Sequence, residues 1–266
     1  MKKRYLCILL LFVLLLQSCG KAETPPPEEP ETKPEVVTTE KPAYTPPRAQ
    51  SLTVIIDPGH GFDDVGSEPE YLSMPECALT LQAAKKLEAA LSERGIFAIL
   101  THDGLTFPSV ETLKAQAKKY GVDYKPEKLE DNGIFSAYER QVYENILAAE
   151  LGNCIFVSLH TNSIENHPDV SGLTVDYCVE NPTAPELERF CRSLQAALWS
   201  EMGAPLTIYA DSTDDSFIVT KSTAIPSVLI EMGYGSNAAD AANLQSDPWM
   251  TQFASVLADV IAEEFE

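Results

Sequence analysis

A short apolar run leads directly into a polar turn at residues 54–61, which read Val54-Ile55-Ile56-Asp57-Pro58-Gly59-His60-Gly61. An unbroken run of this kind, bounded by turn residues, is typical of a strand buried on both faces of a sheet. Pro and Gly then make the chain turn just before a histidine. Because ligands of open α/β sheets bind beyond the carboxyl ends of the strands, His60 is a candidate binding residue.

Short apolar runs alternate with helical patterns from this stretch to the end of the chain. We expect strands over residues 52–56, 96–101, 154–159, 173–179 and 227–230, and helices over 78–94, 110–120, 136–151, 185–202 and 248–265. This alternation predicts an α/β fold, a three-layer α/β/α domain with a largely parallel or mixed central sheet. Residues 103–133 fit the alternation poorly, and a connection of this length is typical of a functional loop or an insertion near a site.

Three further residues could act together with His60. His160 and Glu231 each follow an apolar strand directly, and Glu76 stands in the first turn of the helix over 78–94. Imidazole suits zinc, and a catalytic zinc site has three protein ligands. Its chemistry also needs a carboxylate that takes a proton from water.

Each of these residues also has an ordinary structural role open to it. A histidine at the end of a strand can be a hydrogen-bonded structural residue. Glu76 can interact with the helix dipole, and Glu231 can be an ion-pair partner. The two other histidines, His102 and His167, are expected to be solvent-facing loop residues.

The charge of the chain limits its partners. The 266 residues include 19 Lys and Arg against 40 Asp and Glu, a formal net charge of −21. No nucleic-acid partner is expected, because phosphate binding needs a basic face. Attachment to an anionic membrane by charge alone is excluded for the same reason.

Residues 1–19 have the pattern of an export signal. A basic start at residues 2–4 precedes twelve apolar residues, Tyr5 to Leu16. As a helix these would cover about 18 Å of the roughly 30 Å hydrocarbon core, so a cleavable signal fits better than a spanning anchor. Leu16-Gln17-Ser18-Cys19 then resembles the lipobox of bacterial lipoproteins, in which the cysteine is acylated; the alternative is a secreted protein with a chance cysteine. Two or more acyl chains on Cys19 would anchor the protein stably to a membrane.

Residues 20–50 separate this signal from the rest of the chain. They include eight prolines and six glutamates, with almost no large apolar residues. Such a segment cannot bury enough surface to fold, and it is expected to be an extended tether with a reach of about 100 Å. The chain therefore divides into a signal peptide (1–19), a disordered Pro/Glu-rich tether (20–50) and one globular domain (51–266).

Four separate pieces of this domain resemble the zinc-dependent N-acetylmuramoyl-L-alanine amidases of the Amidase_3 family. They are the turn at residues 54–61, Glu76 with its helix, residues 156–162 (Phe-Val-Ser-Leu-His-Thr-Asn) and residues 225–237 (Ile-Pro-Ser-Val-Leu-Ile-Glu-Met-Gly-Tyr-Gly-Ser-Asn). Arg140 also matches a characteristic position. The likeness covers essentially all of residues 52–266, and the set of four is far more specific than any single piece.

The resemblance implies a peptidoglycan hydrolase that cuts the amide between N-acetylmuramic acid and the L-alanine of the stem peptide. By this likeness His60, Glu76 and His160 bind Zn²⁺, and Glu231 is the general base. Asp57 is a candidate to orient His60, although a turn-forming role before Pro-Gly is equally open. Together with the signal, the likeness implies an extracytoplasmic protein, lipid-anchored to a bacterial membrane, with peptidoglycan as substrate; an activating protein partner is left open.

The sequence departs from the family pattern at positions that leave the expected ligands and base in place. Residues 62–66 lack the usual second glycine and Pro-Gly pair, and Cys77 stands where a basic residue is usual. These departures leave the substrate preference open. The four cysteines of the domain fall mostly within expected helices and strands, so buried thiols are expected rather than disulfides, although export permits disulfides.

Two other classes of function remain open from the sequence. The same fold and zinc site could belong to another cell-wall hydrolase, such as a peptidase or a deacetylase. The domain could also be a non-catalytic wall-binding module, but a binding module has no need of Glu231.

The lipid anchor is directly testable. Cells that express the full-length protein should incorporate labelled palmitate into it, and the variant Cys19→Ala should lose the label because it has no thiol at the acylation position. Gel autoradiography of the two proteins measures this, and equal labelling of the variant would disprove the anchor.

Overall fold

The computed structural model describes residues 51–126, 135–212, 217–221 and 225–266. The expected signal peptide (1–19) with Cys19, the expected tether (20–50) and the end of the 103–133 insertion lie outside the described residues. Within the described part of the chain, no helix is long and apolar enough to cross a membrane.

Six strands form one mixed sheet in the order β2-β1-β3-β6-β4-β5. They are β1 (Thr53–Pro58), β2 (Phe97–Leu100), β3 (Cys154–Asn162), β4 (Leu173–Cys178), β5 (Leu206–Asp211) and β6 (Ser227–Tyr234). Strands β2, β1, β3 and β6 run parallel, whereas β4 is antiparallel to β6 and parallel to β5. The carboxyl ends of β1, β3 and β6 therefore meet at the same edge of the sheet.

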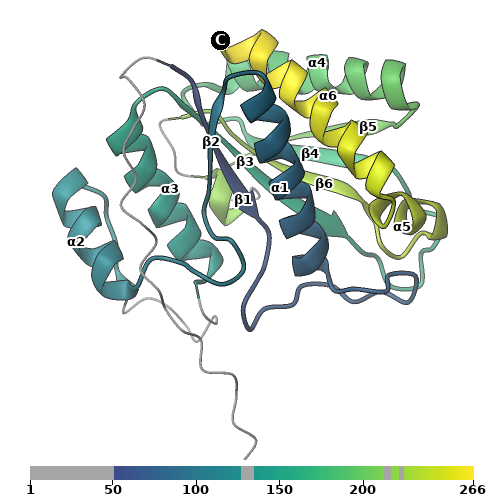
Figure 1. Cartoon of the computed structure of the whole chain (residues 1–266), viewed down its shortest axis with the longest axis horizontal. Coiled ribbons are helices and arrows are strands. Elements are labelled where there is room, and N and C mark those ends of the chain that lie inside the picture. The colour runs from purple at the N-terminus through teal and green to yellow at the C-terminus, as the bar shows by residue number, and fades with distance from the viewer. Residues whose placement is uncertain (1–50, 127–134, 213–216, 222–224) are drawn as a thin grey trace, which may run out of the picture. The chain divides into compact units, whose positions relative to one another are not determined.

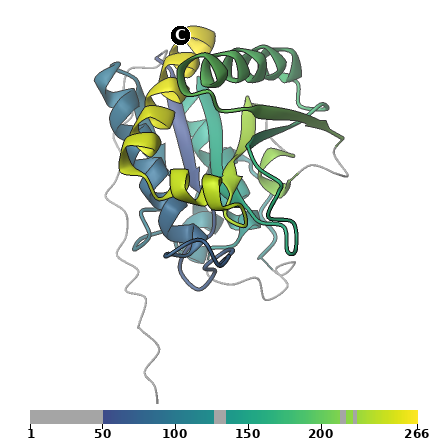
Figure 2. The ribbon, with the colours of Figure 1, turned by 90° about the vertical axis from the view of Figure 1, so that its right-hand side faces the viewer.

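Helices cover both faces of this sheet, which confirms the expected three layers (Figures 1 and 2). One face packs against α1 (Glu76–Glu93), α4 (Ala184–Met202) and α6 (Asp247–Phe265), with the short α5 (Ala238–Leu244) between β6 and α6. The other face packs against α3 (Ala137–Leu151), with α2 (Val110–Tyr120) beside it and a 3₁₀ turn, η2 (Ile218–Thr220), next to α3.

Strand β1 is buried on both sides because it lies between the two helical layers. Val54 and Ile56 belong to the core under α1, α4 and α6, and Ile55 belongs to the core on the α3 side. All three side chains are fully buried. Successive side chains of a strand point to opposite faces, so only an unbroken apolar run can satisfy both cores.

Two strands extend further than their sequence patterns predict. The pairing of β3 with β6 continues past the apolar runs, so that His160 lies opposite Glu231 within the sheet. The expectation that Glu231 ends its strand is therefore wrong, because β6 continues to Tyr234. Hydrogen bonds between neighbouring strands join backbone groups, so a strand can continue through residues with polar side chains. Strand β5 and helix α5 were not predicted.

The described part of the insertion packs on the start of α3. Helix α2 lies against α3, and beyond it the Tyr124 hydroxyl donates to Glu139 Oε1 at 2.9 Å. The backbone N–H of Lys125 donates to the Tyr138 hydroxyl at 2.9 Å. These contacts hold the first turn of α3, which lies at the edge of the sheet where the carboxyl ends meet.

The core under α1 should dominate the stability of the domain. Leu87 on α1 is fully buried, whereas Leu105 is 76% exposed. Leu87→Ala should lower the free energy of unfolding by about 2–5 kcal/mol, because it removes buried methyl groups and leaves a cavity. The same change at Leu105 should alter it by less than about 0.5 kcal/mol. Urea unfolding measures both, and equal effects would contradict the assigned core.

Candidate functional site

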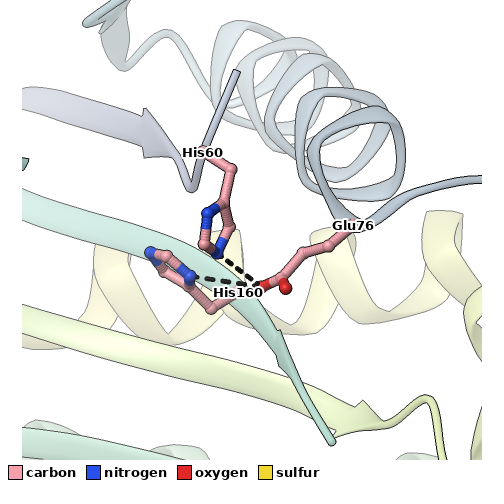
Figure 3. A group of neighbouring side chains, drawn as sticks. All are labelled: His60, Glu76 and His160. Carbon is pink, nitrogen blue, oxygen red and sulfur yellow. Dashed lines mark hydrogen bonds and ion pairs between the residues drawn. The ribbon is translucent and has the colours of Figure 1, made fainter. Parts of the chain in front are cut away.

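Three side chains from distant parts of the chain converge at the edge of the sheet where the carboxyl ends of β1 and β3 lie (Figure 3). His60 follows β1, Glu76 opens α1, and His160 lies on β3. Glu76 Oε1 is 3.2 Å from His60 Nε2 and 3.3 Å from His160 Nδ1. One ligand atom from each residue lies within 4.8 Å of the other two, so the three could hold one metal ion together.

The backbone around His60 leaves space for the imidazole rings of His60 and His160. His60 itself has a φ of 63°, a left-handed conformation that is uncommon for residues other than glycine and is often found at functional sites. A Cβ on Gly59 would lie 2.4 Å from the His160 ring, and a Cβ on Gly66 would lie 2.7 Å from the His60 ring. Both positions therefore need glycine.

Glu76 is the centre of the group. It is 3% exposed, and its carboxylate also accepts the Ser67 N–H at 2.8 Å and the Thr161 N–H at 2.9 Å. Burial by itself would raise its pKa, but hydrogen bonds with His160 and His60 outweigh burial and hold the pKa of Glu76 well below its usual range. Glu76 is therefore ionised and held in place, as a metal ligand must be.

The histidines differ in their electrostatic surroundings. Burial would lower the pKa of His60, but its hydrogen bonds to Glu76 and Asp64 raise it. Burial dominates at His160 and lowers its pKa, with help from the charge of Arg140. A neutral imidazole is the form that binds a metal.

The donor set fits a zinc ion. Two imidazole nitrogens and one carboxylate oxygen, with room for further ligands, are the ligands of known catalytic zinc sites. Ligand atoms about 2.0–2.1 Å from a tetrahedral zinc lie roughly 3.3 Å apart. The two separations from Glu76 Oε1, 3.2 and 3.3 Å, agree with this geometry.

Glu231 lines the same cavity as the three converging residues. It is 8% exposed, and within the described residues its Oε2 has no hydrogen-bond partner. Burial, and then the charges of Glu76 and Asp176, raise the pKa of Glu231 to about 8, against the opposing effect of His60. A dication nearby would lower this pKa again, because positive charge favours the ionised form.

The cavity has a volume of about 490 Å³, which is in the range of small-molecule sites. His60, Glu76, His160 and Glu231 line one part of it. The first turn of α3 with Arg140 lines another part, and Phe217 and Ile218 add an apolar wall.

A buried ion pair lies beneath the turn that carries His60. Asp57 is fully buried, and Arg140 is 5% exposed. The Asp57 carboxylate accepts hydrogen bonds from Thr101 Oγ1 at 2.7 Å, Ser158 Oγ at 2.8 Å and Arg140 Nη1 at 2.9 Å. Among the described residues, none of its hydrogen bonds reaches His60. Asp57 is thus not a hydrogen-bond partner of the His60 ring, contrary to one of the two roles expected for it.

Asp64 makes the contact with the His60 ring instead. Its Oδ2 lies 2.8 Å from His60 Nδ1, and its Oδ1 accepts the Gly66 N–H at 3.0 Å. Two backbone hydrogen bonds between Gly61 and Asp64 close the same short turn. With Nδ1 donating to Asp64, the neutral ring would present the lone pair of Nε2 to a bound metal ion. The only sign of this contact in the sequence is that Asp64 is an acidic residue four positions after His60.

The expectation for His102 was wrong, whereas His167 is exposed as expected. His102 is 1% exposed, and its Nδ1 accepts the Gly104 N–H at 3.2 Å. Its Nε2 therefore carries the proton and donates to the Pro58 carbonyl at 2.8 Å. A hydrogen-bonded neutral imidazole is buried at little cost, and this one supports the turn from below.

The cysteines take no part in the site. In the described part of the chain none of the four forms a disulfide, and Cys154, Cys178 and Cys191 are buried, as expected. Cys77 follows Glu76 but does not belong to the converging group.

The chain matches known proteins over the region that contains this site. The Amidase_3 family profile, described as N-acetylmuramoyl-L-alanine amidase, matches residues 54–263. A "Probable cell wall amidase LytH" of Staphylococcus saprophyticus is 26% identical over 199 residues, which are 73% of this chain and 53% of that protein. The chain thus spans about half the length of this relative.

Two solved structures share the fold at 25% sequence identity. The N-acetylmuramoyl-L-alanine amidase AmiC2 of Nostoc punctiforme matches with a TM-score of 0.57, over 80% of this chain and 96% of that one. The catalytic domain of CwlV, an N-acetylmuramoyl-L-alanine amidase from Bacillus (Paenibacillus) polymyxa var. colistinus, matches with a TM-score of 0.58, over 80% and 97% of the two chains.

The hydrogen bond from Asp64 to His60 should matter for metal binding. Asp64→Ala removes the acceptor that fixes the ring and its tautomer, so zinc affinity should fall about 10–100-fold. The neighbouring change Asp63→Ala is the matched control and should leave the affinity within about twofold. Competition with a chelating zinc indicator measures both values. Equal affinities in wild type and Asp64→Ala would remove Asp64 from the site.

Proposed function

Because the chain belongs to the Amidase_3 family of N-acetylmuramoyl-L-alanine amidases, we propose that it hydrolyses the amide between N-acetylmuramic acid and the L-alanine of the stem peptide. The observation that carries this proposal is a group of three residues that could hold one metal ion, with a buried carboxylate in the same cavity that has an oxygen without a hydrogen-bond partner among the described residues. A wall-binding module would have no use for the second feature, since a buried carboxylate without a partner is costly.

In this proposal His60, Glu76 and His160 hold a zinc ion. When bound there, zinc supplies Lewis-acid polarisation of a carbonyl and makes water nucleophilic at neutral pH. The contribution of the protein is to hold the three ligands in fixed positions. Glu76 is fixed by two backbone N–H groups, and Asp64 fixes the ring of His60, so the ligands keep their positions without a large conformational cost.

Glu231 is the general base and acid of the proposed reaction. Its carboxylate takes a proton from the water that attacks the amide carbonyl. The same carboxylate then delivers the proton to the nitrogen of the departing L-alanine, so that the C–N bond breaks and a free amine forms. Proton transfer of this kind contributes about 10²–10⁴-fold to the rate.

The remaining parts of the proposal concern location. A cell-wall amidase acts outside the cytoplasm, and the expected export signal with Cys19 supports attachment to a bacterial membrane by lipid. The expected tether would then let the domain reach a polymer at some distance from that membrane.

Replacement of Glu231 tests the mechanism. Glu231→Gln keeps the shape but cannot exchange a proton, so the rate of release of stem peptides should fall at least about 100-fold while zinc affinity is retained. The matched control Glu186→Gln, on the exposed first turn of α4, should keep full activity. Chromatography of digested peptidoglycan measures the rate.

The products decide between classes of hydrolase. The proposed reaction creates a free L-alanine amino terminus and leaves the glycan strands intact, whereas a peptidase or a deacetylase gives other new groups. A chelator should abolish activity, and zinc should restore it. Unchanged product release by Glu231→Gln, or products with no new L-alanine amino terminus, would refute the proposal.

A further inference from the structure

The cavity has a second polar feature, on the side formed by α3. Arg140 lines the cavity together with Ser136, Ala137 and Tyr138 from the first turn of the same helix. This feature is separate from the three metal-ligating residues and Glu231. The guanidinium is the one cationic side chain among the described residues that line the cavity, apart from the two histidines.

Among the described residues, only the Nη1 corner of this guanidinium forms hydrogen bonds. Its Nη1 donates to Asp57 Oδ2 at 2.9 Å and to the Pro58 carbonyl at 3.2 Å. The Nε is buried and, within the described part of the chain, has no hydrogen-bond partner, although Arg140 as a whole is only 5% exposed. A buried donor without an acceptor is costly, so its retention beside a cavity points to an acceptor that arrives with a ligand.

The geometry of the Nε–Nη2 edge of the guanidinium indicates which chemical group of a ligand could bind there. Nε and Nη2 of a guanidinium present two parallel N–H donors, which match the two oxygens of a carboxylate. The bond to Asp57 holds the plane of the group, so this edge is fixed before any ligand binds. A single hydroxyl or carbonyl would satisfy only one of the two donors.

The start of α3 favours a negative ligand at the same place. The capping box uses the N–H groups of Ser136 and Glu139, and these bonds fix the first turn. The N-terminal end of a helix carries partial positive charge, which attracts anions. Helix and guanidinium therefore act in the same direction.

We infer that Arg140 and the first turn of α3 form a subsite for a carboxylate of the stem peptide, and that this subsite positions the substrate across the metal-ligating group. The inference rests on the proposed function for the identity of the substrate. The scissile amide itself has no charge, so the carboxylate must come from a residue further along the stem.

The test uses wild-type, full-length, zinc-loaded protein and a set of synthetic muramoyl peptides. Each peptide has one stem carboxylate converted to the carboxamide, and the parent has all of them free. At one position the carboxamide should raise KM about 10-fold or more with little change in kcat, because a charge-assisted bidentate contact is lost. The position at which the carboxamide raises KM identifies the stem residue whose carboxylate binds to the subsite. Equal KM values for all the peptides would overturn the subsite.

Arg140→Lys connects the effect to this residue. Lysine keeps a positive charge next to Asp57 but lacks the two-donor edge, so the discrimination should fall below about twofold. The matched control is Arg94→Lys, the same change at the C-terminal end of α1, where Arg94 pairs with Asp259. This variant should keep the full discrimination. A folded Arg140→Lys protein that still discriminates would overturn the assignment.

A binding measurement separates this inference from the proposed activity. Calorimetry with the cleaved stem peptides, as free acid and as carboxamide, needs no turnover. Tenfold tighter binding of the free acid by the wild-type protein supports the subsite even if no amide is cleaved. Cleavage of every substrate at equal KM, with equal binding of both peptide forms, would keep the amidase and remove the subsite. The wild-type comparison also stands by itself if Arg140→Lys does not fold.

Discussion

The site depends on one buried carboxylate, that of Asp57. It accepts hydrogen bonds from Thr101, which follows β2, and from residues of β3 and α3, and so joins β1 to three other parts of the chain directly below the turn with the first histidine. A buried ion pair of this kind adds little net stability, because desolvation offsets the attraction, but removal of one partner leaves a costly unpaired charge. Its effect is therefore geometric. The turn can occupy only the position in which every partner of Asp57 is satisfied.

The converging group follows from that constraint and from the register of β3 with β6. Parallel β1 and β3 bring His60 and His160 to the same edge, and the shift of register after His160 lets β3 turn its backbone N–H at Thr161 toward Glu76. Such irregularities next to functional sites commonly redirect a side chain or a backbone group. Glu231 lies opposite His160, so one strand pair supplies both a ligand and the proposed base.

Local patterns predicted much of this structure. The expected helix over 110–120 has the bounds of α2, and Ser136 caps α3 at the expected start. Strand β5 was missed because it is an edge strand in which only Leu206 is buried, and its sequence has no long apolar run. The ends of β3 and β6 were placed too early, since a ladder continues through polar residues when its neighbour does.

The sequence by itself determined the order of strands and helices and the residue types of the converging group. Hydrophobic periodicity, caps and turn residues act within a few residues, so they can be read without coordinates. Only the tertiary structure decided that Asp64 rather than Asp57 contacts His60, that His102 is buried, and that Arg140 lines the cavity. These contacts depend on which strands become neighbours and on which partner satisfies each buried charge, and that choice is made by packing across the whole domain.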